Sequence, residues 1–155
     1  MTRRTVPGPV RTALPWLAGV LGFHALVALV GRTTAWRRDD GDAGSLGIRR
    51  TLTHARLELR PTNPHLSRLR MDLAMAGAGI DLTGVPEPPT GIDLTVHVLM
   101  AGISVRVPAG WRVWWEFRGV GSIGSGGTVQ RTHDAHAADL RIHATVLLGR
   151  VGLEG

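Results

Sequence analysis

The residues in this 155-residue chain that are best suited to chemistry are two histidines around an aspartate, His133, Asp134 and His136. Imidazole and carboxylate groups are common zinc ligands, but a zinc site normally needs a third protein ligand in fixed geometry. The other histidines are dispersed along the sequence, and the chain contains no cysteine. We therefore interpret 133–136 as a polar loop and expect neither a metal ion nor another cofactor.

Two serines, Ser122 and Ser125, lie in the segment GVGSIGSGG (119–127), which we interpret as a glycine-rich turn. A nucleophilic serine needs a base held beside it, and no residue pattern marks such a base here. A phosphate-binding loop would need a strand–loop–helix unit, with a lysine in the P-loop version, and this chain has no lysine. We therefore expect a protein that is not an enzyme.

The basic residues carry little information about a nucleic-acid partner. All 18 are arginine and the formal net charge is +6, but the arginines are dispersed along the chain. A nucleic-acid interface normally shows a basic stripe, often interleaved with aromatic residues, and no such stripe exists here. We expect these arginines to lie on a solvated surface and beside a membrane, with no nucleic-acid partner.

An uncharged apolar run, ALPWLAGVLGFHALVALVG, occupies residues 13–31. As a helix its 19 residues would span about 28 Å, close to the hydrocarbon thickness of a bilayer. Trp16 and Trp36 lie where interfacial aromatic residues are expected, and His24 is an ionisable residue inside the run, where such residues are often functional. The run predicts one transmembrane helix; a signal peptide and a helix that caps the following domain are the alternatives.

The chain therefore divides into four parts. A basic tail (1–12) precedes the transmembrane helix (13–31), and a polar linker (32–48) leads to a domain at 49–155. Three arginines flank the apolar run on each side, so the positive-inside rule leaves the side of the membrane undetermined.

From about residue 49 apolar and polar residues alternate, which is typical of strands. Five segments share the form strand, small-residue turn, second strand: 51–60, 69–82, 92–107, 111–127 and 140–155. We align four turn motifs: Met75-Ala76-Gly77, Met100-Ala101-Gly102, Gly119-Val120-Gly121 and Leu148-Gly149-Arg150. The pattern predicts an all-β domain of stacked rungs, either a short β-solenoid or a two-sheet β-roll, preceded by one hydrophobic helix.

Alternation also sorts the residues by face, because successive side chains of a strand point to opposite sides. The predicted core face is entirely apolar: Leu69, Met71, Leu73, Ile92, Leu94, Val96, Val98, Trp111, Val113, Trp115, Phe117, Leu140, Ile142, Ala144 and Val146. The opposite face carries charges of both signs, which can pair across strands.

Trp114 falls on that polar face, between Arg112 and Glu116. A large exposed aromatic residue often marks a partner surface, although it can also pack along an arginine stem on a neighbouring rung or under the N-terminal segment. Together with His97 and His143 of the same face, these three residues form our candidate interaction surface.

The segment SVRVPAGWRVWWEF resembles a signature of the LiaF-like C-terminal domain, found in bacterial cell-wall-active-antibiotic-response proteins. Residues 99–105 and 147–153 resemble the repeated rung of that family, and the resemblance covers about residues 50–155. It implies a non-enzymatic β domain attached to membrane helices in the bacterial cell membrane, with a link to envelope stress. This chain departs from the family in having one hydrophobic segment, and in replacing most Gly-Gly turns.

These observations lead to the hypothesis of a single-pass, non-catalytic envelope protein whose β domain binds or organises an unidentified membrane or envelope protein. The alternative is a soluble or peripheral β domain that self-assembles into a homo-oligomer, with residues 13–31 capping the stack.

Overall fold

The computed structural model describes residues 38–155 and, before them, Gly22, Ala25, Leu26, Leu29 and Thr33. Nine strands follow one another: β1 (Gly47–Thr53), β2 (Arg56–Leu59), β3 (Arg68–Ala74), β4 (Gly77–Asp81), β5 (Ile92–Leu99), β6 (Gly102–Arg106), β7 (Arg112–Gly126), β8 (Gln130–Arg131) and β9 (Leu140–Glu154). All pairings between these strands are parallel. The expected fold class is confirmed at this level, since the described domain is mostly β, with parallel strands in a solenoid-like arrangement.

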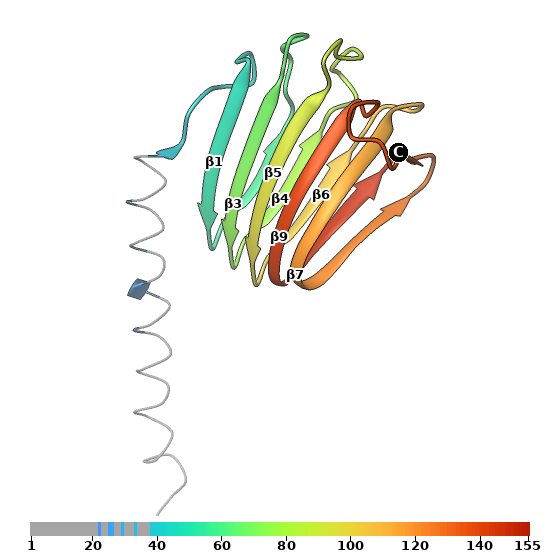
Figure 1. Cartoon of the computed structure of the whole chain (residues 1–155). Helices are drawn as coiled ribbons and strands as arrows, with labels where there is room; N and C mark the ends of the chain where they lie inside the picture. Colours follow the sequence, from blue (N-terminus) through green and yellow to red (C-terminus); the bar gives the residue numbers. More distant parts are fainter. Residues whose placement is uncertain (1–21, 23–24, 27–28, 30–32, 34–37) are drawn as a thin grey trace, which may run out of the picture.

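The strands form two layers (Figure 1). The first sheet has the order β1-β3-β5-β9-β7, in which β9 contributes residues 140–147 and β7 residues 113–120. The second sheet has the order β2-β4-β6-β9-β7 and uses the C-terminal parts of the same two long strands. Each rung therefore contributes one strand segment to each layer, and the two layers enclose the core.

The predicted core face is confirmed almost residue for residue. Leu69, Leu94 and Ile142 have no exposed surface, and most other predicted members are buried beside them. Only Trp115 and Phe117 are partly exposed. They lie on β7, whose outer edge pairs only with the two residues of β8, and Arg131 of β8 stacks over the Trp115 ring at 4.4 Å.

The spatial order of the rungs departs from their order in the sequence. The last rung, on β9, lies between the third and fourth rungs, because it pairs with β5 and β6 on one side and with β7 on the other. All rungs share one alternation pattern, so local sequence does not encode their order. The chain instead passes over the end of the stack through residues 127–139 and inserts its final strand.

The turns between the layers are very short and unusual in conformation. Met75, Met100 and Leu148 have left-handed backbones, with φ of 49°, 50° and 58°. The predicted alignment of their three motifs is confirmed by the strand register, but that of Gly119-Val120-Gly121 is wrong by one residue. β7 has no counterpart of Leu148, so Gly121 pairs with Gly149 across a bulge.

Gly119 in β7 pairs with Val146 and has a positive φ of 116°, and a Cβ there would collide with the Val146 carbonyl oxygen. In every rung the chain passes from the first sheet to the second at the same edge of the domain, around residues 54–55, 75–76, 99–101, 119–121 and 147–149. We call this edge the turn corner. The opposite edge, where longer connectors return to the next rung, we call the connector edge.

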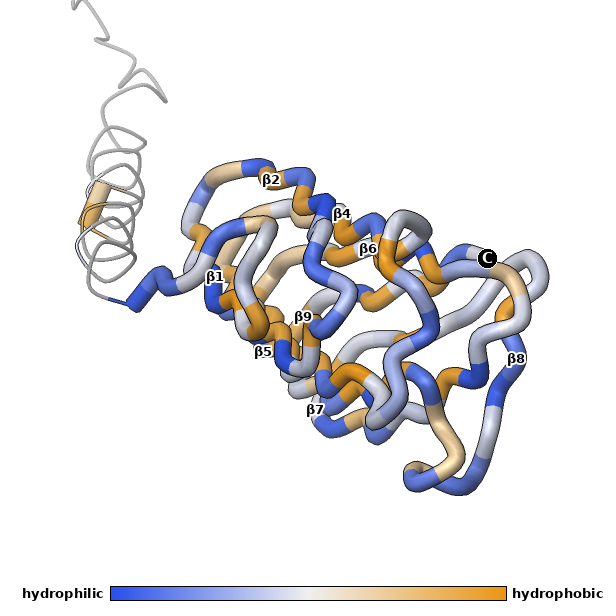
Figure 2. Tube along the Cα trace, turned by 90° about the horizontal axis from the view of Figure 1, so that it is seen from above, coloured by the Kyte–Doolittle hydropathy of each residue, from blue (hydrophilic) through white to orange (hydrophobic). Residues whose placement is uncertain are grey.

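The chain before β1 runs back along the first rung. Asp40 and Arg49 exchange backbone hydrogen bonds of 3.1 and 2.8 Å in an isolated antiparallel bridge, and the Asp39 carboxylate accepts the Thr51 N–H at 2.6 Å. The segment 39–46, within the expected linker, is thus hydrogen-bonded to the domain. Figure 2 shows this part of the chain entering the domain beside β1.

Within the part of the chain that the structure describes, no helix is long and apolar enough to cross a membrane. Most of the predicted transmembrane run lies outside the described residues, as do Trp16, His24 and Trp36.

Candidate interaction surface

Ion pairs or short polar contacts join every neighbouring pair of strands on the outer face of the first sheet. Arg49 reaches Asp72 at 3.6 Å between β1 and β3, and His97 Nδ1 lies 2.6 Å from the Asp72 carboxylate between β3 and β5. Further along, Arg141 pairs with Asp93 at 2.6 Å between β5 and β9. The expected cross-strand pairing of opposite charges is therefore present.

The fourth contact joins β9 to β7, where His143 Nδ1 lies 3.5 Å from the Glu116 carboxylate. Arg118 donates two hydrogen bonds to the same carboxylate, at 2.7 and 3.0 Å. The outer face is thus a continuous ladder of five strands whose charged side chains hold one another in place.

Asp72 is the most connected carboxylate of this ladder. Its partial burial opposes ionisation, but hydrogen bonds from His97 and Arg70 outweigh that effect and lower the pKa of Asp72. Asp72 therefore stays ionised at neutral pH and organises three basic side chains around one carboxylate.

The same electrostatic pattern repeats at the other end of the ladder. The hydrogen bond from Arg141 lowers the pKa of Asp93, and the Asp93 carboxylate in turn raises the pKa of Arg141. The hydrogen bond from Arg118 lowers the pKa of Glu116. These groups form fixed ion pairs, and none of the three is poised to exchange a proton near neutral pH.

The structure brings four of the five proposed surface residues together. Trp114 packs edge-on against His143, with ring centroids 5.3 Å apart, and is half-buried. His97 and His143 lie on adjacent strands two positions out of register, and with Glu116 they line a shallow depression of about 210 Å³. Trp114 therefore contacts a histidine ring, whereas an arginine stem was the contact weighed from the sequence.

Arg112 lies apart from this group, at the connector edge. Its backbone N–H donates to Asp139 at 2.7 Å, and its guanidinium lies 3.5 Å from the other carboxylate oxygen. Asp139 is the one buried charged residue among those described, so this pair anchors the start of β7 to the start of β9.

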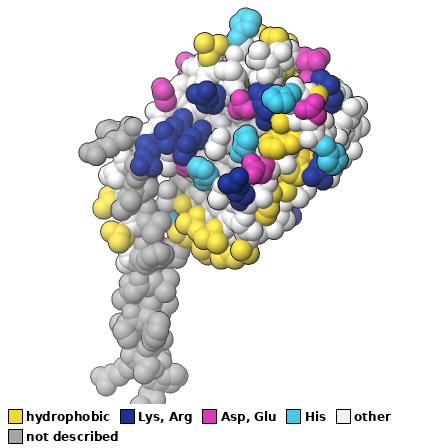
Figure 3. All heavy atoms as spheres, viewed as in Figure 1, with side chains coloured by type: hydrophobic (Ala, Val, Ile, Leu, Met, Phe, Trp, Pro, Cys, Tyr) yellow, Lys and Arg dark blue, Asp and Glu magenta, His cyan; other side chains and the backbone are white. Residues whose placement is uncertain are grey.

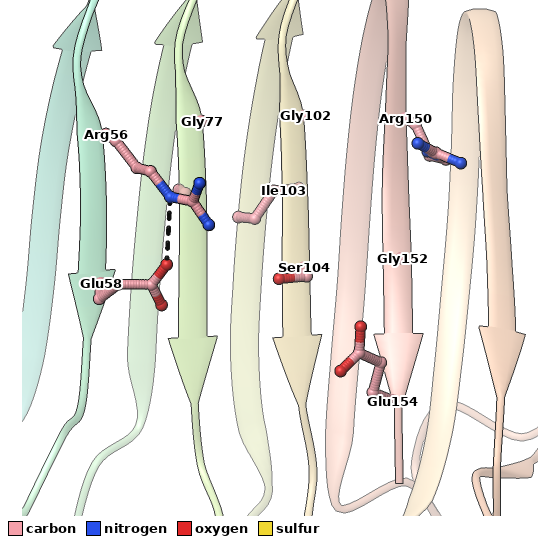
Figure 4. Close-up of a pocket in the computed structure, with 10 residues that line it drawn as sticks. Arg56, Glu58, Gly77, Gly102, Ile103, Ser104, Arg150, Gly152 and Glu154 are labelled. Carbon is pink, nitrogen blue, oxygen red and sulfur yellow. Dashed lines mark ion pairs between the residues drawn. The ribbon is translucent and has the colours of Figure 1, made fainter.

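A second surface, which sequence reasoning missed, is a trough across the outer face of the second sheet (Figure 4). Its floor is the backbone at Gly77, Gly102 and Gly152, and its volume is about 680 Å³. Arg56 and Glu58, paired at 3.5 Å, stand at one end, with Arg150 and Glu154 at the other. In the sequence this trough corresponds to small residues at alternate positions, Gly77 and Gly79 in β4 and Gly102 and Ser104 in β6.

A third surface is the turn corner itself. Of the six large hydrophobic side chains that are exposed within residues 38–155, five lie there: Leu99, Met100, Val120, Leu147 and Leu148. Figure 3 shows hydrophobic side chains gathered along the lower edge of the domain, below a face rich in charged residues and histidine. The sequence signal was an apolar residue in each turn motif.

The histidines and serines considered from the sequence for metal binding and nucleophilic catalysis lie in a connector and in a strand. Within the described residues, no three histidine, aspartate or glutamate side chains gather as a metal site would require. His133 and His136 lie exposed in the connector before β9, where the Asp134 carboxylate accepts the His136 N–H at 2.9 Å. Ser122 and Ser125 lie within β7, so the segment interpreted as a glycine-rich turn is a strand.

No protein-family model, curated protein or solved structure matches this chain.

Proposed function

We propose that this protein is a single-pass, non-catalytic protein of the bacterial cell membrane whose β domain is an interaction or scaffold module. The observation that carries the proposal is the laddered outer face of the first sheet. Every strand there is tied to its neighbour by an ion pair or a short polar contact, so the polar side chains are ordered before any partner arrives. Preorganisation of this kind lowers the entropic cost of binding a protein surface.

Trp114 and His143 supply the apolar centre of this surface. An aromatic residue surrounded by charged side chains is typical of an interface centre with a polar rim. The partner is therefore expected to be an envelope protein that offers an aromatic or aliphatic side chain and carboxylate or guanidinium groups around it. The role in envelope stress rests on the family resemblance alone.

The anchor rests on the apolar run at 13–31. Leu26 and Leu29, its two leucines that the structure describes, expose 59% and 62% of their surface. Neither is buried against the β domain, which favours insertion into a bilayer over capping of the stack.

Membrane fractionation of the full chain with a C-terminal tag tests the anchor. We expect the protein to stay in the membrane pellet after a carbonate wash, and protease treatment of intact spheroplasts then assigns the side of the β domain. Release into the soluble fraction would refute the anchor.

Site-specific crosslinking tests the interaction surface. A photo-reactive residue replacing Trp114 should give a discrete crosslinked species in cells, whereas the same residue replacing Ala109, exposed at the connector edge, should give none. Equal crosslinking from both positions would contradict a specific surface at Trp114.

The alternative, a self-assembling β domain, is favoured by the strand edges. β2 pairs only with β4 among the described strands, and the outer edge of β7 is covered by β8 at two residues only. Unpaired edges of this kind promote end-to-end association. Sedimentation of the full chain in detergent separates the two functions, because self-assembly predicts concentration-dependent oligomers and the anchored module does not require them.

A further inference from the structure

The turn corner carries hydrophobic residues at positions where they are unfavourable for the isolated domain. Met100 and Leu148 expose 56% and 60% of their surface, and both adopt left-handed backbones. L-residues with Cβ atoms are strained in that conformation, and asparagine or glycine relieves the strain. Residues that break two local rules at once are commonly retained for function.

The exposed side chains of the corner form one continuous ridge. Leu99, Leu147 and Val120 are direct cross-strand neighbours on β5, β9 and β7. Beside them, an apolar depression of about 360 Å³, with Leu52, Leu73 and Val98 in its wall, extends the ridge onto the outer face of the first sheet. A contiguous apolar surface on an otherwise charged domain marks a contact site.

The direction of the chain before β1 identifies what the ridge faces. Residues 38–40 run antiparallel to β1, so the chain followed backwards from Asp40 moves from Arg49 towards Thr51 and the turn corner. The apolar run ends at Gly31, seven residues before Arg38, and seven residues span at most about 25 Å. Continued in the direction that residues 38–40 take, the chain leads a bilayer that holds this run to the side of the domain where the ridge is.

The charges around the ridge agree with an anionic lipid surface. No acidic residue lies within three sequence positions of any of its five exposed side chains, and Asp72, which lines the neighbouring depression, is paired with Arg49, Arg70 and His97. Arg150, two residues after Leu148, is exposed, whereas Arg118 is paired with Glu116 at 2.7 Å. Basic residues beside an apolar ridge strengthen contact with anionic headgroups.

We propose that the turn corner rests on the membrane, with Leu99, Met100, Val120, Leu147 and Leu148 in the interfacial region of the bilayer. This inference rests on the proposed anchor, and it defines the orientation of the β domain relative to the bilayer. The sheets rise from the membrane, the connector edge points away from it, and the laddered face is presented sideways to neighbouring proteins.

Fluorescence quenching of the full chain in vesicles tests this orientation. The chain has no cysteine, so Met100→Cys and Leu148→Cys each provide one labelling site at the corner. Ala109→Cys, at the connector edge, is the control. Vesicles of phosphatidylcholine and phosphatidylglycerol contain a lipid with a nitroxide near its headgroup, and iodide is the aqueous quencher. We expect the nitroxide to quench the corner labels several-fold more than the control label, and iodide to show the reverse.

A matched pair of charge variants sharpens the test. Leu147→Glu places a carboxylate on the ridge, and Ala109→Glu places one at the exposed connector edge. With the label at Leu148→Cys, only Leu147→Glu should lower the quenching by the nitroxide.

The outcomes separate this inference from the proposed anchor. Equal quenching of corner and control labels by iodide, in a chain that floats with the vesicles, would overturn the membrane contact and leave the anchor standing. Protection of the corner from both quenchers would also overturn it, and would indicate a second copy or residues 13–31 as the cover. A chain that does not float with the vesicles would refute the anchor itself.

Discussion

At the turn corner the chain passes between the two sheets in at most two residues, whereas at the connector edge it uses segments of five to thirteen residues. The corner is closely packed backbone with exposed hydrophobic side chains, and Gly119, Gly121 and Gly149 lie against neighbouring carbonyl groups. The connector edge carries prolines, polar loops and the buried Asp139. The corner thus defines the spacing of the rungs, while the connector edge accommodates their irregular order.

Glycine substitutions should reveal this difference with the largest effect. A Cβ at Gly149 would collide with the Ala101 carbonyl oxygen and crowd Val98 and Val146, whereas a Cβ at Gly84, in a connector, meets nothing within 4 Å. We expect Gly149→Ala to lower the free energy of unfolding by about 3 kcal/mol, because a well-packed backbone contact cannot yield. Gly84→Ala should change it by less than about 0.5 kcal/mol. Urea unfolding of the full chain in detergent, followed by circular dichroism, measures both. Similar losses in the two variants would remove the proposed distinction between the edges.

At the connector edge, Asp139 is the residue whose hydrogen bonds join the start of β7 to the start of β9. Its carboxylate accepts the Arg112 N–H at 2.7 Å, while its backbone N–H donates to the Arg112 carbonyl at 2.9 Å. Asp139→Ala removes the acceptor of the Arg112 N–H in a part-buried hydrogen bond and should cost about 2 kcal/mol. Asp139→Asn retains an acceptor and should cost less than half as much in the same unfolding assay. Equal losses would mean that the charge, and not the hydrogen bond, holds this edge.

Much of the architecture between these edges was readable from the sequence. Strict alternation identified the buried residues of β3, β5 and β9, since one misplaced residue would bring charge into the core. The alternation on either side also fixes the alignment of the turn motifs of Met75, Met100 and Leu148, which the strand register confirms. What alternation lacks is any distinction between rungs, so the insertion of β9 between β5 and β7 left no local signal.

The candidate surfaces were predictable to different degrees. The polar face with Trp114, Glu116, His97 and His143 follows from alternation, but the choice of partners within it depends on the rung order. Because β9 adjoins β7, His143 meets Glu116 and Trp114. The left-handed backbone at Met100 depends on tertiary packing of the corner. Glycine and asparagine are the residues that adopt this conformation readily, so a methionine gives no signal of it in the sequence.

The strands between the two edges should show a smaller, pH-dependent effect at Asp72. Its pKa is lowered in the folded protein, so the stabilisation is present above the unfolded-state value near 3.8 and is lost as pH falls through the lower folded value. Asp72→Asn should therefore cost about 1 kcal/mol at pH 7, and the deficit should be smaller at pH 3, which lies below the unfolded-state value. Thermal unfolding at both pH values provides the measurement, with Thr95→Ala as a control on the same face. A deficit that does not change with pH would show that Asp72 acts through packing and not through its charge.

The smallest effect should have the opposite sign and should come from the corner. Met100→Asn places a residue suited to left-handed backbone at a φ of 50°, so the isolated domain should gain up to about 1 kcal/mol in unfolding free energy. Leu99→Asn removes a neighbouring exposed side chain at an ordinary φ and should bring no such gain. In vesicles, both variants should weaken the contact between the corner and the bilayer. A residue that lowers the stability of the domain while strengthening its membrane contact is what selection for function at the corner would retain. A loss of stability in Met100→Asn would mean instead that Met100 is held by packing, and the strain argument for the corner would fail.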